Sequence, residues 1–186
     1  MATHPQPIWI TLFKDSFIDL EIKSPRINYQ NTLVQLENKP ELLGGIIRDQ
    51  QMASCCIGAM WLKADFFEKS HRLFQDIPTP TGSLWHGISH RREGDHGNAS
   101  YWFARCQGHP ACKAVGSIHG SSHQDNQSRS MKTNGNWNYD FFNRSVENRS
   151  KDVNTVEQLK NLQETEWRET FLWTLQHALV KAPPID

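Results

Sequence analysis

The sequence lacks any long apolar run. No window in its 186 residues approaches the roughly 18 consecutive apolar residues that a membrane-spanning helix needs, so no membrane partner is expected. The N-terminal stretch MATHPQPIWITLFKDS also lacks a basic region followed by a long apolar one, the pattern of a secretory signal. Together these absences predict a soluble protein located in the cytoplasm.

An excess of charge of either sign is also missing. Twenty basic side chains balance twenty acidic ones, and Arg91-Arg92 is the longest basic run in the helical part of the chain. A protein that follows a phosphate backbone usually presents a basic stripe, so no nucleic-acid partner is expected. Only four cysteines are present, and in a cytoplasmic chain they are expected to remain free thiols.

The apolar pattern predicts a mainly α fold, a single-domain helical bundle. Residues 54–74 place apolar side chains and His71 at spacings of three and four, which indicates one continuous amphipathic helix. The stretch PTPTG at 78–82 ends this helix, because proline cannot extend it. The next helix is expected over 84–93, capped by Thr81 or Ser83, and Gly94 ends it.

The whole chain, 1–186, is expected to form this one domain. Its parts are an N-terminal arm with short helices (1–50), motif-bearing helices (51–112), a flexible polar segment (113–153) and a C-terminal helix (154–182). Two short apolar runs, Ile8–Phe13 and Phe17–Ile22, suit either a short N-terminal hairpin or irregular packing arms. Within the polar loop, only the cluster from Trp137 to Phe142 is expected to dock on the core.

The C-terminal helix is expected to be capped by Asn154 or Thr155 and to bury Trp167 and Phe171. A further helix after Gly94 is expected to begin with Asp95 or Asn98 as its cap.

Histidines and carboxylates concentrate in the two helices that flank PTPTG. On a helix, His86, His90 and Glu93 fall within about 60° of one another, and His-x3-His lets two imidazoles bind one metal. The preceding helix carries Glu68 and His71, a Glu-x-x-His pair of the kind found in dimetal carboxylate bundles. The short connection makes these helices antiparallel neighbours, so His71 is expected to face His86.

A complete metal motif is absent. Gly87 follows His86 where a zincin has glutamate, and only one Glu-x-x-His pair occurs. The alternative is therefore open that His71 is a core histidine and that His86 and His90 are rim residues hydrogen-bonded to neighbouring carboxylates.

Arginine and aromatic residues beside the histidines suggest a ligand site. Arginine suits carboxylate or phosphate, and a helix start attracts anions. The residues predicted to bind a ligand are Arg92, Asn98, Tyr101 and Trp102. Arg92 is expected to have a buried partner, Asp95 or Glu68, because an unpaired buried guanidinium is costly. The alternative is that the arginines complement a helix dipole while the aromatics fill the core.

A second group of possible zinc ligands follows. It consists of Cys106, His109, Cys112, His119 and His123. Their order matches no familiar zinc motif, and chance composition remains the alternative.

The stretch from Ser54 to Pro110 resembles an uncharacterised family of bacterial and fungal helical proteins, whose motif runs ESH, TPTGSFWH, HRREGDxxNAxYWFRR and HP. The matching positions are Ser70-His71, Thr79–Ser83, Trp85-His86, His90–Asp95, Asn98-Ala99, Tyr101–Phe103 and His109-Pro110. The resemblance implies a shared site, not a particular reaction, and adds weight to His71, His86, His90, Glu93 and Asp95. The sequence departs from the motif at Lys69 and Cys106, and its 113–153 segment has no counterpart there.

The leading hypothesis is an enzyme that uses one divalent transition metal, and no nucleotide cofactor, for hydrolase or lyase chemistry on a small anionic molecule. The residues expected to carry it are the metal ligands His71, His86, His90 and Glu68, the general base Glu93 or Asp95, and Arg92 to orient the substrate. The alternative is a non-catalytic binding or scaffold module in which these side chains form a satisfied buried polar network. The oligomeric state is left open.

Overall fold

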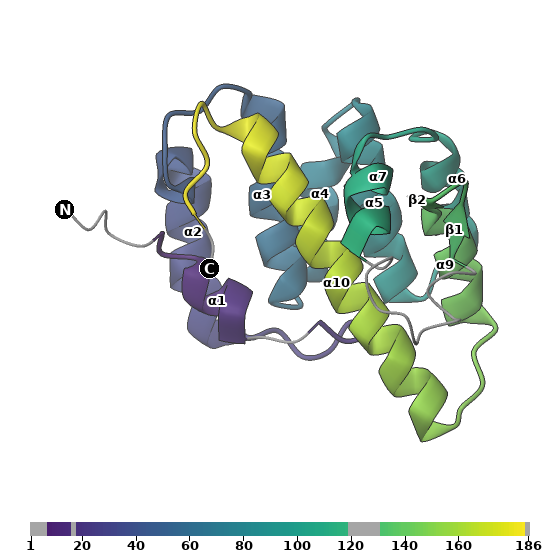
Figure 1. Cartoon of the computed structure of the whole chain (residues 1–186). Coiled ribbons are helices and arrows are strands. Elements are labelled where there is room, and N and C mark those ends of the chain that lie inside the picture. Colours follow the sequence, from purple (N-terminus) through teal and green to yellow (C-terminus); the bar gives the residue numbers. More distant parts are fainter. Residues whose placement is uncertain (1–6, 16–17, 119–130, 185–186) are drawn as a thin grey trace.

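The computed structural model describes residues 7–15, 18–118 and 131–184 of the chain, and this part is a mainly helical bundle (Figure 1). Its α-helices are α1 (Ile10–Asp15), α2 (Gln30–Asn38), α3 (Gln50–Lys63), α4 (Phe67–Gln75), α5 (Pro80–Glu93), α6 (His96–Ala104), α7 (Ala111–Ile118), α9 (Tyr139–Glu147) and α10 (Val153–Ala178). Two 3-10 turns, η1 (Ile27–Tyr29) and η2 (Pro40–Leu43), and a short hairpin of β1 (Lys132–Thr133) and β2 (Asn136–Trp137) complete it. Across the described ranges, no helix has the length and apolar character needed to cross a membrane.

The 26-residue helix α10 crosses the bundle and packs against α3 and α7 (Figure 1). Trp167 and Phe171 are both 0% exposed, which confirms their predicted place in the core. Trp85 of α5 donates a 3.1 Å hydrogen bond from Nε1 to Thr174 Oγ1, which fixes α5 to α10. The helix begins one residue before the expected caps, because Asp152 Oδ1 accepts from Thr155 N and so takes the capping role.

The helix predicted over 54–74 is two helices, because the chain breaks at Asp65. This residue has a φ of 65°, a left-handed conformation that ends α3 and re-aims the chain into α4. Its buried carboxylate is held by Arg92 at 2.7 Å and by Arg26 at 3.3 Å, and it accepts from Lys23 N. Contacts with distant segments therefore override a local pattern that favoured one helix.

Helix α5 begins earlier than expected. Thr79, not Thr81 or Ser83, is its cap, and its Oγ1 accepts from Gly82 N at 3.1 Å. Pro80 takes the first helical position, where its missing N–H costs nothing. Gly94, with a φ of 93°, ends α5 as predicted. Asp95, one of the two expected caps, starts α6 by accepting from Asn98 N.

The polar segment 113–153 is more ordered than expected. It contributes most of α7, the hairpin and all of α9, while residues 119–130 lie outside the described part. Trp137 and Phe142 are 2% and 0% exposed, so the predicted docking of this cluster is confirmed. At the other end of the chain, the first apolar run forms helix α1 rather than a strand of a hairpin.

A fully buried ion pair joins α5 to α10. Arg91 donates from Nη1 and Nη2 to the two carboxylate oxygens of Glu166, and both side chains are 0% exposed. Arg91 Nε also donates to Gln163 Oε1 at 3.3 Å, and Trp137 Nε1 donates to Glu166 Oε2 at 2.6 Å. The hairpin, α5 and α10 thus meet at one carboxylate.

Candidate metal centre

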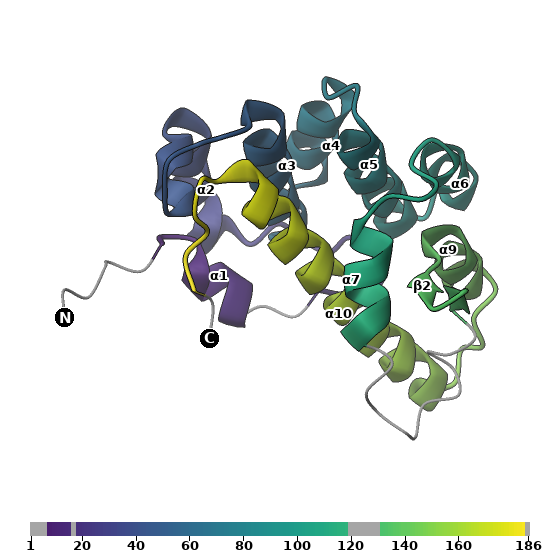
Figure 2. The same cartoon turned by 45° about the horizontal axis from the view of Figure 1, so that its top comes forward.

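Helices α4 and α5 lie side by side (Figure 2). Together they bring three histidine side chains close to one another. His71 comes from α4, and His86 and His90 come from successive turns of α5. Their ring centroids are 4.6 to 4.9 Å apart, and one nitrogen from each ring lies within 4.8 Å of the others. This buried group can hold a metal ion. The predicted facing of His71 and His86 is therefore confirmed.

The histidine cluster is shielded from solvent. His86 is 2% exposed and His90 is 5% exposed, whereas His71 is half-buried. Burial lowers the pKa of His86 to about 3, helped by the charges of His90 and His71. Burial and His90 also lower the pKa of His71, against the opposing charges of Glu93 and Glu68. Neutral imidazoles are the form that binds metal.

Within residues 7–15, 18–118 and 131–184, neither ring nitrogen of His86 has a hydrogen-bond partner. One face of its ring instead stacks on Trp102, with centroids 4.1 Å apart. Phe67 packs beside the other two histidines, with centroids 5.3 Å from His71 and 6.4 Å from His90. The surroundings of the cluster are therefore mainly aromatic.

His90 is oriented at both of its ring nitrogens. Its Nδ1 lies 3.1 Å from Glu93 Oε2, so the proton of a neutral ring sits on Nδ1 and points at the carboxylate. Its Nε2 lies 3.2 Å from Asn98 Nδ2 and is left as the acceptor. A histidine whose other nitrogen donates to a carboxylate is the usual arrangement around protein-bound metals.

The remaining carboxylates occupy different places. Glu93 touches His90 and its side chain is 43% exposed. Glu68 is exposed and lies outside the three-histidine group, although its charge acts on the pKa of His71. Asp95 accepts from Asn98 N at 3.0 Å and caps α6. Of the acidic residues predicted for the site, Glu93 is therefore the one that contacts a histidine of the cluster.

The buried position of Arg92 does not fit its predicted role in binding a ligand. It is 0% exposed and donates to Asp65 Oδ1 at 2.7 Å, so its buried partner is neither Asp95 nor Glu68 as predicted. The same guanidinium also donates to the backbone carbonyls of Asp19, Leu62 and Glu21. Its donors thus hold the N-terminal segment and the break after α3 against α5.

Trp102, which stacks on His86, also contacts Tyr101 and Arg105. Tyr101 is 56% exposed and its ring meets Trp102 edge to face at 5.3 Å. The Arg105 guanidinium lies 5.7 Å from the Tyr101 ring centroid and 5.5 Å from that of Trp102. Arg105 was not among the residues predicted for the site, although its spacing of three and four from these aromatics places it on the same helix face.

The cysteine-rich group predicted as a second zinc site does not gather as ligands within the described residues. His109 shares a 3.0 Å hydrogen bond with Thr81 and accepts from Ala111 N, so its ring is held between α5 and the first residue of α7. Burial raises the pKa of Cys106 to about 12 and of Cys112 to about 11, which disfavours the thiolates that bind zinc. His119 and His123 lie outside the described residues.

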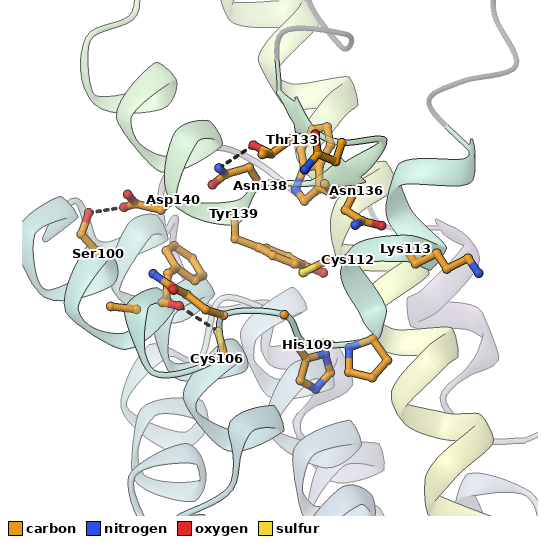
Figure 3. Close-up of a pocket in the computed structure, with 17 residues that line it drawn as sticks. Ser100, Cys106, His109, Cys112, Lys113, Thr133, Asn136, Asn138, Tyr139 and Asp140 are labelled. Carbon is orange, nitrogen blue, oxygen red and sulfur yellow. Dashed lines mark hydrogen bonds between the residues drawn. The ribbon is translucent and has the colours of Figure 1, made fainter.

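These cysteines instead line a cavity of about 600 Å³ between α6, α7, α9 and the hairpin. Cys106 and His109 lie on one side of it, and Thr133 and Asn138 on the opposite side (Figure 3). The sequence analysis missed the hairpin, although Asn134-Gly135 is a strong turn signal; both residues have positive φ, 53° and 80°.

Comparison of the chain with protein-family models, with curated proteins and with solved structures gave no significant match, and the chemistry of the site rests on its own geometry.

Proposed function

We propose that His71, His86 and His90 bind one divalent transition metal, and that this centre catalyses hydrolysis or a lyase reaction on a small anionic molecule. The observation that carries the proposal is His86, whose two buried ring nitrogens have no hydrogen-bond partner among the residues that the structure describes. A buried polar group left unpaired costs about 1–3 kcal/mol, and a metal ligand bond would remove that cost for one nitrogen.

The competing function, a scaffold with a satisfied polar network, suits the two buried arginines better than the histidines. Arg91 and Arg92 use every guanidinium nitrogen in hydrogen bonds to protein oxygens. Both buried guanidinium groups are therefore satisfied in full, whereas His86 is surrounded by three aromatic rings: those of Trp102, His71 and His90. A purely structural site would be expected to contain leucine or phenylalanine at that position.

The donor set favours zinc, cobalt, nickel or copper over magnesium or calcium, because imidazole nitrogen suits the former and oxygen the latter. Zinc–nitrogen bonds of about 2.0–2.1 Å in a tetrahedron place ligand atoms about 3.3 Å apart. The histidine nitrogens lie within 4.8 Å of one another, so the ligands must move closer together on binding. His71 can supply that movement, because it is half-buried and no hydrogen bond to another described residue holds its ring.

Three imidazoles leave a coordination position open, as in catalytic zinc sites. A metal held in this way polarises a substrate and lowers the pKa of bound water to about 7. Glu93 fixes His90 from the Nδ1 side of the ring and is 43% exposed, so it would accept a proton from the reacting molecule through a bridging water. Arg105, whose guanidinium lies 5.5 Å from the centroid of the Trp102 ring that stacks on His86, is an exposed cation suited to orient an anionic substrate, and in this role it replaces Arg92.

The test starts from chelator-treated full-length protein titrated with zinc and cobalt. Wild type should bind one equivalent and gain thermal stability. His86→Leu should abolish binding while leaving the metal-free melting temperature unchanged or raised, since no hydrogen bond is lost.

His96→Leu is the matched control, because His96 Nδ1 is paired with Asn143 Oδ1 at 2.8 Å. This variant should lose stability yet still bind metal. Two results together would support the scaffold instead: metal does not change the melting temperature of wild type, and metal-free His86→Leu melts at a lower temperature than metal-free wild type.

Catalysis needs its own measurement. Metal-loaded protein should hydrolyse some members of a panel of small carboxylate and phosphate esters, and Glu93→Gln should lower kcat by about 100-fold or more. Metal binding without any turnover across such a panel would limit the proposal to the metal centre alone.

A further inference from the structure

We infer that Asn98 is a displaceable fourth ligand of this metal centre: its amide nitrogen holds His90 in the metal-free protein, and its amide oxygen binds the metal until a substrate replaces it. The inference rests on the metal-binding part of the proposed function. It adds a residue that regulates access to the open coordination position.

The side-chain amide of Asn98 lies close to the ring of His90. Asn98 Nδ2 lies 3.2 Å from His90 Nε2, the nitrogen that remains for a metal because Nδ1 faces Glu93. Ligand atoms of a tetrahedral zinc or cobalt ion lie about 3.3 Å apart. The amide of Asn98 therefore already lies at the separation from His90 that a neighbouring ligand of the same ion would have.

The turn between α5 and α6 positions the Asn98 amide. Gly94 turns the chain with a φ of 93° directly after Glu93, and Asp95 then caps α6 by accepting from Asn98 N at 3.0 Å. Both partners of His90, Glu93 and Asn98, are thus held on either side of one tight turn. The backbone of Asn98 is thus fixed in the first turn of α6, and the hydrogen bond from Nδ2 places its half-buried side chain at His90.

The side-chain amide of Asn98 offers both a donor and an acceptor atom. Its nitrogen donates and its oxygen accepts, and a half-turn of the planar group exchanges the two with little change of shape. Asn98 can therefore satisfy His90 Nε2 as a donor when no metal is bound and offer oxygen when that nitrogen is occupied. A neutral carbonyl ligand also leaves the full positive charge of the metal to attract an anion, which the carboxylate of an aspartate would offset.

The test uses full-length protein loaded with cobalt, whose visible absorption bands report the number and type of its ligands. Asn98→Ala should weaken cobalt binding by about tenfold or more and change the shape of the spectrum. Asn98→Asp should restore four-ligand bands and tighten binding. Asn161→Ala, which changes an exposed asparagine on α10, is the matched control and should leave both readouts as in wild type.

Displacement is tested with inorganic phosphate as the probe. Adding phosphate to cobalt-loaded wild type should shift the spectrum towards that of Asn98→Ala with phosphate bound. The variant should bind phosphate more tightly, because no protein ligand has to leave first. In Asn98→Asp, phosphate should bind more weakly than in wild type.

Two results would overturn the inference while leaving the metal centre intact. One is an Asn98→Ala protein whose cobalt affinity and spectrum equal those of wild type. The other is a phosphate affinity that does not change among wild type, Asn98→Ala and Asn98→Asp. Asn98→Gln, which keeps the amide but moves it by one methylene, guards against a folding defect: it should fold as wild type and still show the altered spectrum. Failure of wild type to take up cobalt would refute the centre itself.

Discussion

The buried ion pair between Arg91 and Glu166 gives the sharpest test of how this bundle is held together. Glu166→Gln keeps the size of the side chain and removes its charge. Both partners are 0% exposed, so the Arg91 guanidinium would be left charged in the interior with no neighbouring carboxylate. Breaking one partner of a buried pair costs about 3–5 kcal/mol, because a solvated alternative is not within reach.

The double variant Arg91→Met with Glu166→Gln separates charge from packing. It removes both charges, and the glutamine oxygen can still accept from Trp137 Nε1, which now bonds Glu166 at 2.6 Å. Replacing both charges of a buried pair is often close to neutral, so we expect most of the lost stability to return.

Urea unfolding followed by far-UV circular dichroism and tryptophan fluorescence measures both changes. A loss below about 1 kcal/mol for Glu166→Gln would show that water reaches the pair and that its charge is already screened. A double variant no more stable than the single one would show that hydrogen-bond geometry, not charge, is the dominant contribution.

Three further outcomes are expected. Trp167→Ala should destabilise the protein by about 3–5 kcal/mol, since the side chain is fully buried; a loss below about 1 kcal/mol would place α10 outside the core. Gly82→Ala should prevent stable folding or lower the melting temperature sharply, because a Cβ there would lie 2.2 Å from the Ile77 carbonyl oxygen; a normal melt would contradict this packing. Burial lowers the pKa of His109 to about 4, below its unfolded value of about 6.5, so the unfolded chain binds more protons between these values. Stability should therefore fall as pH drops through this window, and His109→Gln should reduce that fall in melts recorded from pH 7 to 4.

The sequence predicted the mainly helical fold and the meeting of the three histidines because both depend on local spacing. His86 and His90 share a helix face by their separation alone, and the short PTPTG connection brings His71 back to them. Trp167 and Phe171 follow the apolar periodicity of a single long helix, so their burial was predictable in the same way.

The break at Asp65 and the partner of Arg92 were not predictable from such patterns. Asp65 adopts its positive φ while Arg26 and Arg92, far away in the sequence, hold its carboxylate. Periodicity contains no information on which distant segments will meet, so it favoured one unbroken helix and a partner for Arg92 close to the motif. The helices α7 and α9 were missed for the same reason, since α7 packs against α10 and β2, and α9 packs against α6.

The histidine cluster and the hydrophobic core differ in the sequence separation between the residues that contact each other. The described residues that hydrogen-bond to His90 or pack on its ring belong to α4, α5 and α6, which are neighbours in the sequence. The core, in contrast, is closed by α10, whose Glu166 pairs with a residue 75 positions earlier. Contacts between near neighbours in sequence form with little loop-closure entropy, so the histidine cluster is expected to assemble before α10 docks during folding. In kinetic terms, substitutions in α10 should mainly speed unfolding, while substitutions at the α4–α5 connection should slow folding. The ligands of the proposed metal centre would then come together before the core closes, so a metal added during refolding should favour formation of the histidine cluster and leave the rate at which α10 docks unchanged.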